Sequence, residues 1–157
     1  MRIKLLSTLP LIMGCAVEPY VQAVPLPDRA STAVRAPFDH TWDAVIDVFA
    51  SGNLPIAPID NVSGLIVAAP LQVARQDAWL WTSCGWRHAY ETAGRYRAFA
   101  TKGEFNVLVR AAGQGATVRV TAAWSGPDLP TRPVQACTST GVFESLLEAR
   151  IKVAAER

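Results

Sequence analysis

Hydrophobic positions recur at helical spacing in two stretches of the chain. Between residues 38 and 50 aspartates occupy one side of a helix and apolar residues the other: Phe38, Trp42, Val45, Ile46 and Phe49. From Val142 onward a second stripe consists of Phe143, Leu146, Leu147, Ile151 and Ala154, and Glu148 and Lys152 are expected to pair on its exposed side. The period of about 3.6 residues predicts two amphipathic helices. We expect the second to lie across the apolar face of a sheet.

Other apolar residues alternate with polar ones, as in half-buried strands. Two such runs flank a turn at Gly113-Gln114-Gly115; their inward residues are Phe105, Val107 and Val109, then Val118, Val120, Ala122 and Trp124. Residues 54–59 contain two prolines, which favours an edge or bulged strand, and residues 64–69 complete a hairpin with it. A short first strand is expected from Thr32 to Arg35.

The order of these elements predicts the fold class. It is strand, helix, strand, strand, an irregular middle, strand, strand and helix, without the long crossovers that a parallel sheet needs. We therefore expect an α+β domain of two layers, with an antiparallel sheet of about five strands and two helices on one face. The chain has 157 residues, which suits one domain, placed at residues 34–157.

The first fourteen residues have the composition of an export signal. Arg2 and Lys4 form a cationic start, an apolar run extends from Leu5 to Met13, and Gly14 is small. That run is shorter than the ~20 residues of a membrane-spanning helix. We therefore interpret residues 1–14 as a signal peptide.

The run Ile12-Met13-Gly14-Cys15 resembles a lipobox, the cleavage site of bacterial lipoproteins. The resemblance implies that Cys15 carries diacylglycerol and an N-acyl chain, which together hold a protein on a membrane. Residues 15–33, rich in proline, would form an extended tether. Ala16 follows the cysteine in place of aspartate, which implies an outer-membrane lipoprotein facing the periplasm. The alternative is an ordinary secretory signal with a chance cysteine.

Loss of the signal changes the charge of the chain. The full sequence has 15 basic and 13 acidic residues. Removing Arg2 and Lys4 leaves as many basic as acidic residues in the mature chain. A neutral chain lacks the positive field that attracts phosphate backbones, so we do not expect a nucleic-acid partner.

Lipidation of Cys15 leaves two of the 3 cysteines, Cys84 and Cys137. In an oxidising compartment such a pair favours a disulfide over a metal or catalytic site. The alternative is two separate buried thiols.

Residues 74–103 resist a regular assignment and hold many of the aromatic residues. Alternation at Trp79 and Trp81 permits a strand. One interpretation is that these two rings cover the sheet and the disulfide fixes the loop. The other is an exposed partner-binding patch, because Trp, Tyr and Arg dominate interface energies. Its candidates are Trp79, Trp81, Trp86, Arg87, Tyr90, Arg95 and Tyr96.

We find no pattern that indicates catalysis or a metal centre. His88 follows Cys84 in a Cys-x-x-x-His spacing, but no second cluster completes a zinc site. No Gly-x-Ser-x-Gly element occurs, and Gly113-Gln114-Gly115 lies between two strands, as a hairpin turn does and a phosphate loop does not. We expect a protein that is not an enzyme and has no cofactor or metal.

Three runs of the chain resemble the helix-grip domains of the outer-membrane assembly lipoprotein BamC and related small lipoproteins. They are FDHTWDAVIDVFASGNLPIAPIDNVSGLIVA, FNVLVRAAGQGATVRVTAAW and CTSTGVFESLLEARI, within Val34 to Ala154. The resemblance implies an accessory or scaffold subunit that contacts other envelope proteins. The alternative is a carrier that holds an apolar ligand between the sheet and the C-terminal helix. A packed core under Phe143, Leu147 and Ile151 would favour the scaffold, and an open pocket would favour the carrier.

Replacement of Cys15 tests the lipid anchor. Because the acyl chains attach to its thiol, Cys15→Ser should release the protein from the membrane fraction or leave it uncleaved. Fractionation and gel mobility measure both effects. Unaltered membrane attachment and mobility would show that Cys15 is not lipidated.

Overall fold

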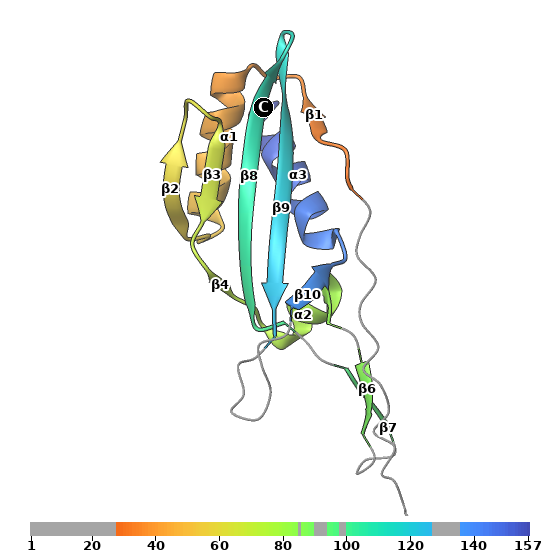
Figure 1. Cartoon of the computed structure of the whole chain (residues 1–157). Coiled ribbons are helices and arrows are strands. Elements are labelled where there is room, and N and C mark those ends of the chain that lie inside the picture. Colours follow the sequence, from red (N-terminus) through yellow and green to blue (C-terminus); the bar gives the residue numbers. More distant parts are fainter. Residues whose placement is uncertain (1–27, 85, 90–93, 98–99, 127–135) are drawn as a thin grey trace, which may run out of the picture.

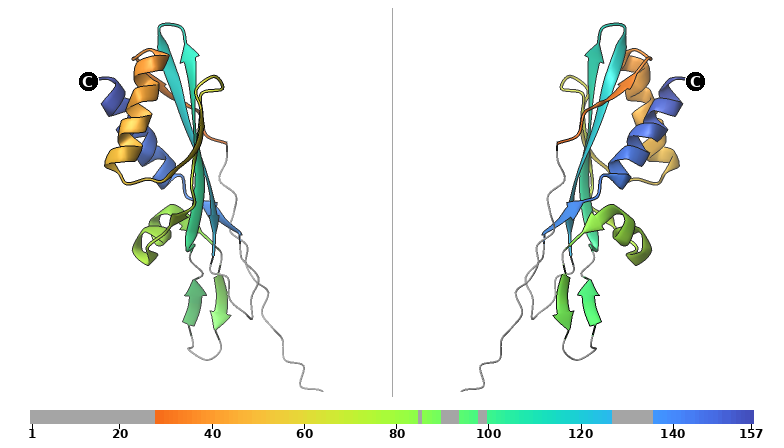
Figure 2. Two further views of the ribbon diagram at one scale, coloured as in Figure 1. Left: turned by 90° about the vertical axis from the view of Figure 1, so that its left-hand side faces the viewer. Right: turned by 90° about the vertical axis from the view of Figure 1, so that its right-hand side faces the viewer.

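The computed structural model describes residues 28–84, 86–89, 94–97, 100–126 and 136–157. In these ranges the chain forms an α+β fold of three helices and an open antiparallel sheet (Figure 1). Helices α1 (Phe38–Ser51) and α3 (Val142–Ala155) cover the same face of the sheet (Figure 2). The short helix α2 (Arg75–Trp81) lies on that side, near the start of α3.

The main sheet has eight strands among the described residues, so the expected number of about five is wrong. Its order is β2-β3-β8-β9-β10-β5, with β1 beside β9 and β4 beside β8. The bounds are β1 Thr32–Val34, β2 Ile56–Asp60, β3 Leu65–Ala68, β4 Leu71–Gln72, β5 Thr82–Ser83, β8 Lys102–Ala112, β9 Gly115–Ser125 and β10 Ala136–Ser139. A separate hairpin joins β6 (Trp86–Ala89) to β7 (Gly94–Arg97). The unexpected strands have two to four residues, too few for alternation to mark them.

The long hairpin of β8 and β9 is the centre of the sheet and confirms the strongest strand prediction. Each strand has 11 residues, paired in continuous register from Lys102 opposite Ser125 to Ala112 opposite Gly115. The connecting loop contains Gly113, whose φ of 61° favours glycine. The alternation of buried and exposed positions follows the predicted faces over most of both strands.

The predictions for β2 and α1 are also confirmed. Strand β2 is at the edge of the sheet, and its register with β3 shifts between Ile56 and Ile59. Helix α1 buries Val45 and Phe49, and the chain leaves it through Asn53 at a φ of 49°.

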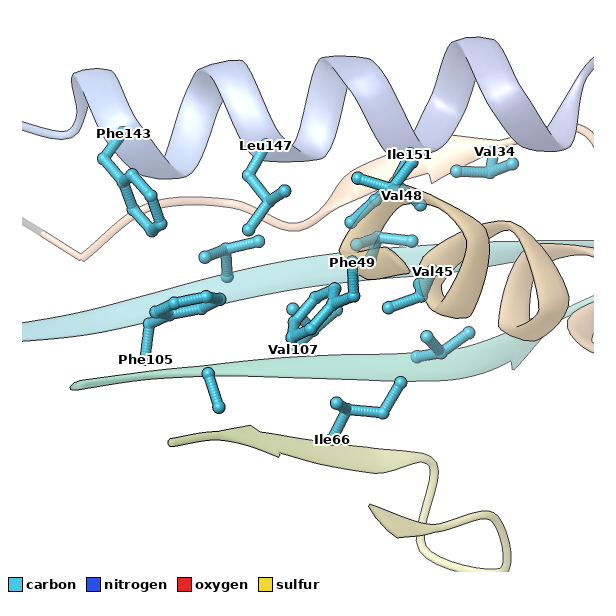
Figure 3. Close-up of a cluster of buried hydrophobic side chains, with 14 of the residues drawn as sticks. Val34, Val45, Val48, Phe49, Ile66, Phe105, Val107, Phe143, Leu147 and Ile151 are labelled. Atoms are coloured by element: carbon cyan, nitrogen blue, oxygen red, sulfur yellow. The ribbon is translucent and has the colours of Figure 1, made fainter. Parts of the chain in front are cut away.

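The core lies between the sheet and the two long helices (Figure 3). Phe143, Leu147 and Ile151 point from α3 toward the sheet and are buried there, where Phe105 of β8 meets them. Phe105 and Phe143 pack edge to face with ring centroids 5.0 Å apart. This packed arrangement confirms that α3 lies across the apolar face of the sheet.

Helix α3 is rotated about its axis relative to the sequence prediction. Glu148, expected on the exposed side beside Lys152, is only 2% exposed, and Glu144 is also buried. Leu146, expected in the buried stripe, is 56% exposed. The buried face therefore combines the apolar column with the two glutamates, and the prediction for Glu148 and Leu146 is wrong.

Hydrogen-bond donors from β9, from β1 and from Arg29, which precedes β1, explain why Glu148 is buried. The Val120 backbone N–H of β9 donates to Oε1 at 2.9 Å, and the Thr32 hydroxyl of β1 donates to Oε2 at 2.7 Å. Arg29 Nη2 lies 3.3 Å from Oε2. Strand β1 pairs with β9 as far as Val118, and β10 pairs with β9 from Trp124 onward. The Glu148 carboxylate binds the edge of β9 between these two pairings, where neither strand reaches.

Glu156, which directly follows α3, contacts the chain at the other end of β1. The Arg35 backbone N–H donates to Glu156 at 2.8 Å, and the Arg35 guanidinium lies 3.1 Å from the same carboxylate. These hydrogen bonds lower the pKa of Glu156. Hydrogen bonds to Glu148 and Glu156 thus attach both ends of β1 to α3 and the residue that follows it.

Glu148→Ala tests the buried carboxylate. The substitution leaves the Val120 N–H and the Thr32 hydroxyl without their acceptor. It also removes the carboxylate partner of the partly buried Arg29, which keeps its hydrogen bond to Ser145, so we expect it to lower the unfolding free energy by about 3 kcal/mol. Glu104, an exposed glutamate of β8, is the matched control, and Glu104→Ala should cost under about 0.5 kcal/mol. Urea denaturation measures both; equal losses would contradict the role of Glu148.

Candidate partner-binding site

The segment that was expected to be irregular or a strand begins with a helix. Residues Arg75–Trp81 form α2, so the strand interpretation of Trp79 and Trp81 is wrong. Residues two apart in a helix project about 200° apart around its axis. The two tryptophans therefore point in nearly opposite directions: Trp81 covers the sheet, as the first interpretation expects, and Trp79 is exposed, as the second requires.

Trp81 belongs to the core. Its ring centroid is 5.1 Å from that of Phe143 and 5.9 Å from that of Trp124. Trp124 lies over Gly103 on the paired strand, where a side chain would overlap its ring. Trp81 thus covers the end of the sheet and closes the aromatic cluster beneath α3.

Trp79 and its neighbour Leu80 face outward. Trp79 is 47% exposed and Leu80 is 62% exposed. The Arg75 guanidinium lies 6.0 Å from the centroid of the Trp79 ring, at the limit of a cation–π contact. Tryptophan and arginine are residue types that binding surfaces favour, and Leu80 adds exposed apolar area beside them.

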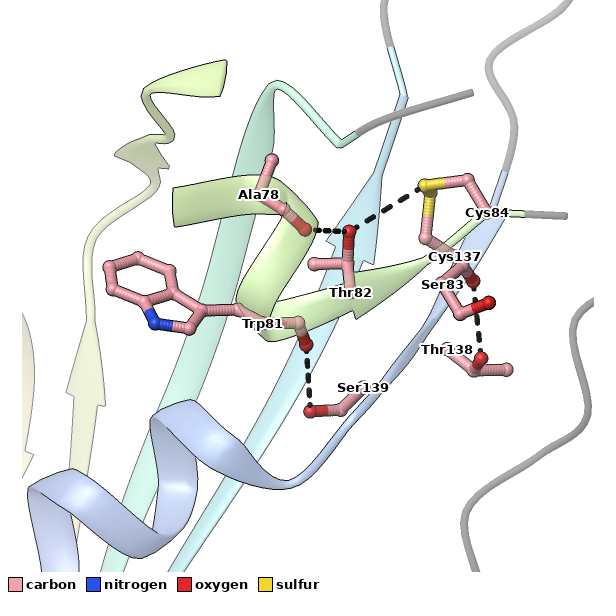
Figure 4. Close-up of a disulfide and its surroundings, with 8 residues drawn as sticks. All are labelled: Ala78, Trp81, Thr82, Ser83, Cys84, Cys137, Thr138 and Ser139. Atoms are coloured by element: carbon pink, nitrogen blue, oxygen red, sulfur yellow. Dashed lines mark hydrogen bonds between the residues drawn. A yellow bond between two sulfur atoms is a disulfide. The ribbon is translucent and has the colours of Figure 1, made fainter. Parts of the chain in front are cut away.

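The segment after α2 is covalently attached to the sheet (Figure 4). Cys84 and Cys137 form the expected disulfide, across a sequence separation of 53 residues. Strand β5 pairs with β10, with Ser83 opposite Thr138 and Thr82 opposite Ser139. Inside this corner the buried Thr82 hydroxyl donates to the Ala78 carbonyl at 2.7 Å. These bonds fix the orientation of α2.

Thr140, between β10 and α3, also holds the carboxyl end of α2. The Thr140 hydroxyl donates to the Leu80 carbonyl at 2.6 Å, and the Thr140 N–H donates to the Trp81 carbonyl at 2.9 Å. Because both carbonyls have partners, the exposed side of α2 is a firmly placed surface.

The β6–β7 hairpin carries four of the remaining candidates. Trp86 is opposite Arg97, Arg87 opposite Tyr96, and His88 opposite Arg95. The hairpin extends beyond the end of the main sheet (Figure 2). It starts two residues after Cys84, so the disulfide anchors its first strand near α2.

Two predicted site residues, Cys15 and Tyr90, lie outside the described residues. One residue was missed: Leu80, because the segment was not recognised as a helix. Its sequence, RQDAWLW, contains good helix formers and no glycine or proline. This composition favours a helix, and a helix predicted here would have placed Leu80 beside Trp79 on its surface.

The described residues contain neither a metal-binding cluster nor a membrane-spanning helix. Within them, no three His, Cys, Asp or Glu side chains are placed to hold a metal ion. None of the described helices is long and apolar enough to cross a bilayer.

Comparison with known proteins gave no relative: the chain matches no family model and no curated protein.

Removing the disulfide tests how much the link between Cys84, after α2, and Cys137 of β10 stabilises the fold. A closed loop of 53 residues restricts the unfolded chain, and its loss should lower the unfolding free energy by about 4 kcal/mol. We expect urea denaturation of Cys84→Ser/Cys137→Ser to show this loss of unfolding free energy. A thiol reducing agent should lower the unfolding free energy of the wild type in the same way and leave that of the variant unchanged. A variant as stable as the oxidised wild type would contradict this prediction.

Proposed function

We propose that this protein is a lipid-anchored accessory or scaffold subunit of the bacterial cell envelope, with a helix-grip domain similar to those of BamC. In this proposal Cys15 holds the chain on the outer membrane, facing the periplasm, and the domain binds another envelope protein. The observation that carries the binding role is the exposed pair Trp79 and Leu80 on α2, fixed beside the base of the β6–β7 hairpin.

The order of the site supports binding. Ordering a surface before it binds lowers the entropy lost on association. Here the disulfide, the β5–β10 pairing and the Thr140 hydrogen bonds hold α2 in place. Trp86, Arg87, Arg95 and Tyr96 of the hairpin add residue types that are frequent at interfaces.

Core packing favours the scaffold over a carrier of an apolar ligand. Phe143, Leu147 and Ile151 are buried against the sheet, in the space that the ligand of a carrier would occupy. Trp81, Trp124, Phe105 and Phe143 fill the end of that space, with centroids 5.0 to 5.9 Å apart. Native mass spectrometry separates the two functions, because a lipid bound at one per chain would support the carrier.

Trp79→Ala/Leu80→Ala tests the binding role. A photoreactive residue at position 79 of the anchored chain first identifies the neighbouring protein in the membrane. Because truncating a central aromatic contact commonly costs 2 kcal/mol or more, the double variant should bind that protein at least about tenfold more weakly. Stability should change less than on truncation of a core residue, since Trp79 is about half exposed and Leu80 is largely exposed.

Val62→Ala is the matched control. Val62 is 99% exposed in the turn between β2 and β3, away from α2. It should leave the affinity unchanged. Equal affinity of wild type and double variant would contradict the assignment of the site to α2.

A further inference from the structure

The outer side of the helical layer carries an apolar seam that no other part of the described chain covers. On α3, Val142, Leu146, Ala149 and Val153 follow one another at intervals of four, three and four residues, and all are exposed. Leu146 and Val153 are 56% and 55% exposed. This spacing is that of the seam by which one helix packs on another. The seam borders a groove between α1 and α3 of about 620 Å³, lined also by Val48 and Ala154.

The two helices beside this groove carry opposite charges. Helix α1 carries three exposed aspartates, Asp39, Asp43 and Asp47, of which Asp47 lines the groove, and it has no lysine or arginine. On the other side of the groove are Arg150 and Arg157, whereas Glu144 and Glu148 of α3 are buried. Among the described residues, the side chains of Asp43, Asp47, Arg150 and Arg157 form no ion pair.

We propose that this face binds a second copy of the chain in a two-fold dimer. A closed two-fold interface uses the same patch on both subunits, so the patch must be complementary to itself. An axis along the groove, parallel to the helices, places α1 of each copy over α3 of the other. The aspartates of one copy then face the arginines of its partner, and the apolar linings of both grooves meet.

This surface differs from the exposed side of α2, and the dimer does not depend on the function proposed above. An amphipathic helix of another protein could also fill the groove, but it would need acidic residues on one flank and basic residues on the other. A second copy supplies both flanks from this sequence. The complementary charges therefore favour self-association.

Paired charge reversals test the dimer in the full-length chain. The first variant is Asp43→Arg/Asp47→Arg, which makes α1 basic, and the second is Arg150→Asp/Arg157→Asp, which makes α3 acidic. Each variant alone faces like charges across the two-fold axis. One copy of each, however, restores opposite charges at both contacts. Cells express two copies with different tags, each with a photoreactive residue in place of Leu146, and illumination traps neighbours.

We expect the wild type to give an adduct of two chains that carries both tags. Either variant alone should give at least about tenfold less, and co-expression of the two variants should restore the adduct. The same photoreactive residue at Val62 should give none. Adducts with a different protein, no adduct from the wild type, or no recovery in the mixture would overturn the proposal.

Urea midpoints of both variants verify that they fold. If either is unstable, the single reversals Asp47→Lys and Arg150→Glu replace them in the same design. Trp79→Ala/Leu80→Ala leaves every residue of this face in place, so it should form the dimer normally. Failure of the α2 site and failure of the dimer are thus separate results.

Discussion

The carboxylate of Glu148 joins α3 to β9 and to the N-terminal end of the described chain. Through it α3 contacts the edge of β9 and the side chains of Arg29 and Thr32, more than a hundred residues earlier in the chain. Moving a carboxylate out of water is costly, and hydrogen bonds must compensate for it. A backbone N–H, a hydroxyl and a guanidinium do so here. Because all three must be in place together, the rotation of α3 and the position of β1 depend on one another.

The same contact explains which parts of the fold could be predicted. The β8–β9 hairpin and α1 were predictable because their patterns extend over many residues and each buries an apolar face. In α3 the column of Phe143, Leu147 and Ile151 was also clear. Hydrophobicity alone then favours Leu146 as the next buried residue, whereas the structure buries Glu148. The deciding factor is the set of donors on β1 and β9, and no periodicity within α3 reveals them.

The candidate site was only partly predictable for a related reason. The disulfide followed from the number of cysteines, and it is where it was expected. Trp79 and Trp81, however, lie on opposite sides of α2, whereas their spacing of two in the sequence permits a strand. A helix of seven residues has too few turns for a period to be recognised. Its stability comes from contacts with β10 and α3, which are distant in sequence.

The rotation of α3 also has a consequence for the outside of the molecule. A helix that buries two glutamates must place other residues outward, and in α3 these include Leu146 and Val153. Burying a leucine side chain instead would be worth about 2 kcal/mol, less than the ~3 kcal/mol expected from the hydrogen-bonded Glu148. The buried glutamate therefore determines which residues of α3 remain exposed, and both faces of this helix can make contacts. The polar one then fixes β1, and the apolar one is free to pack against another helix.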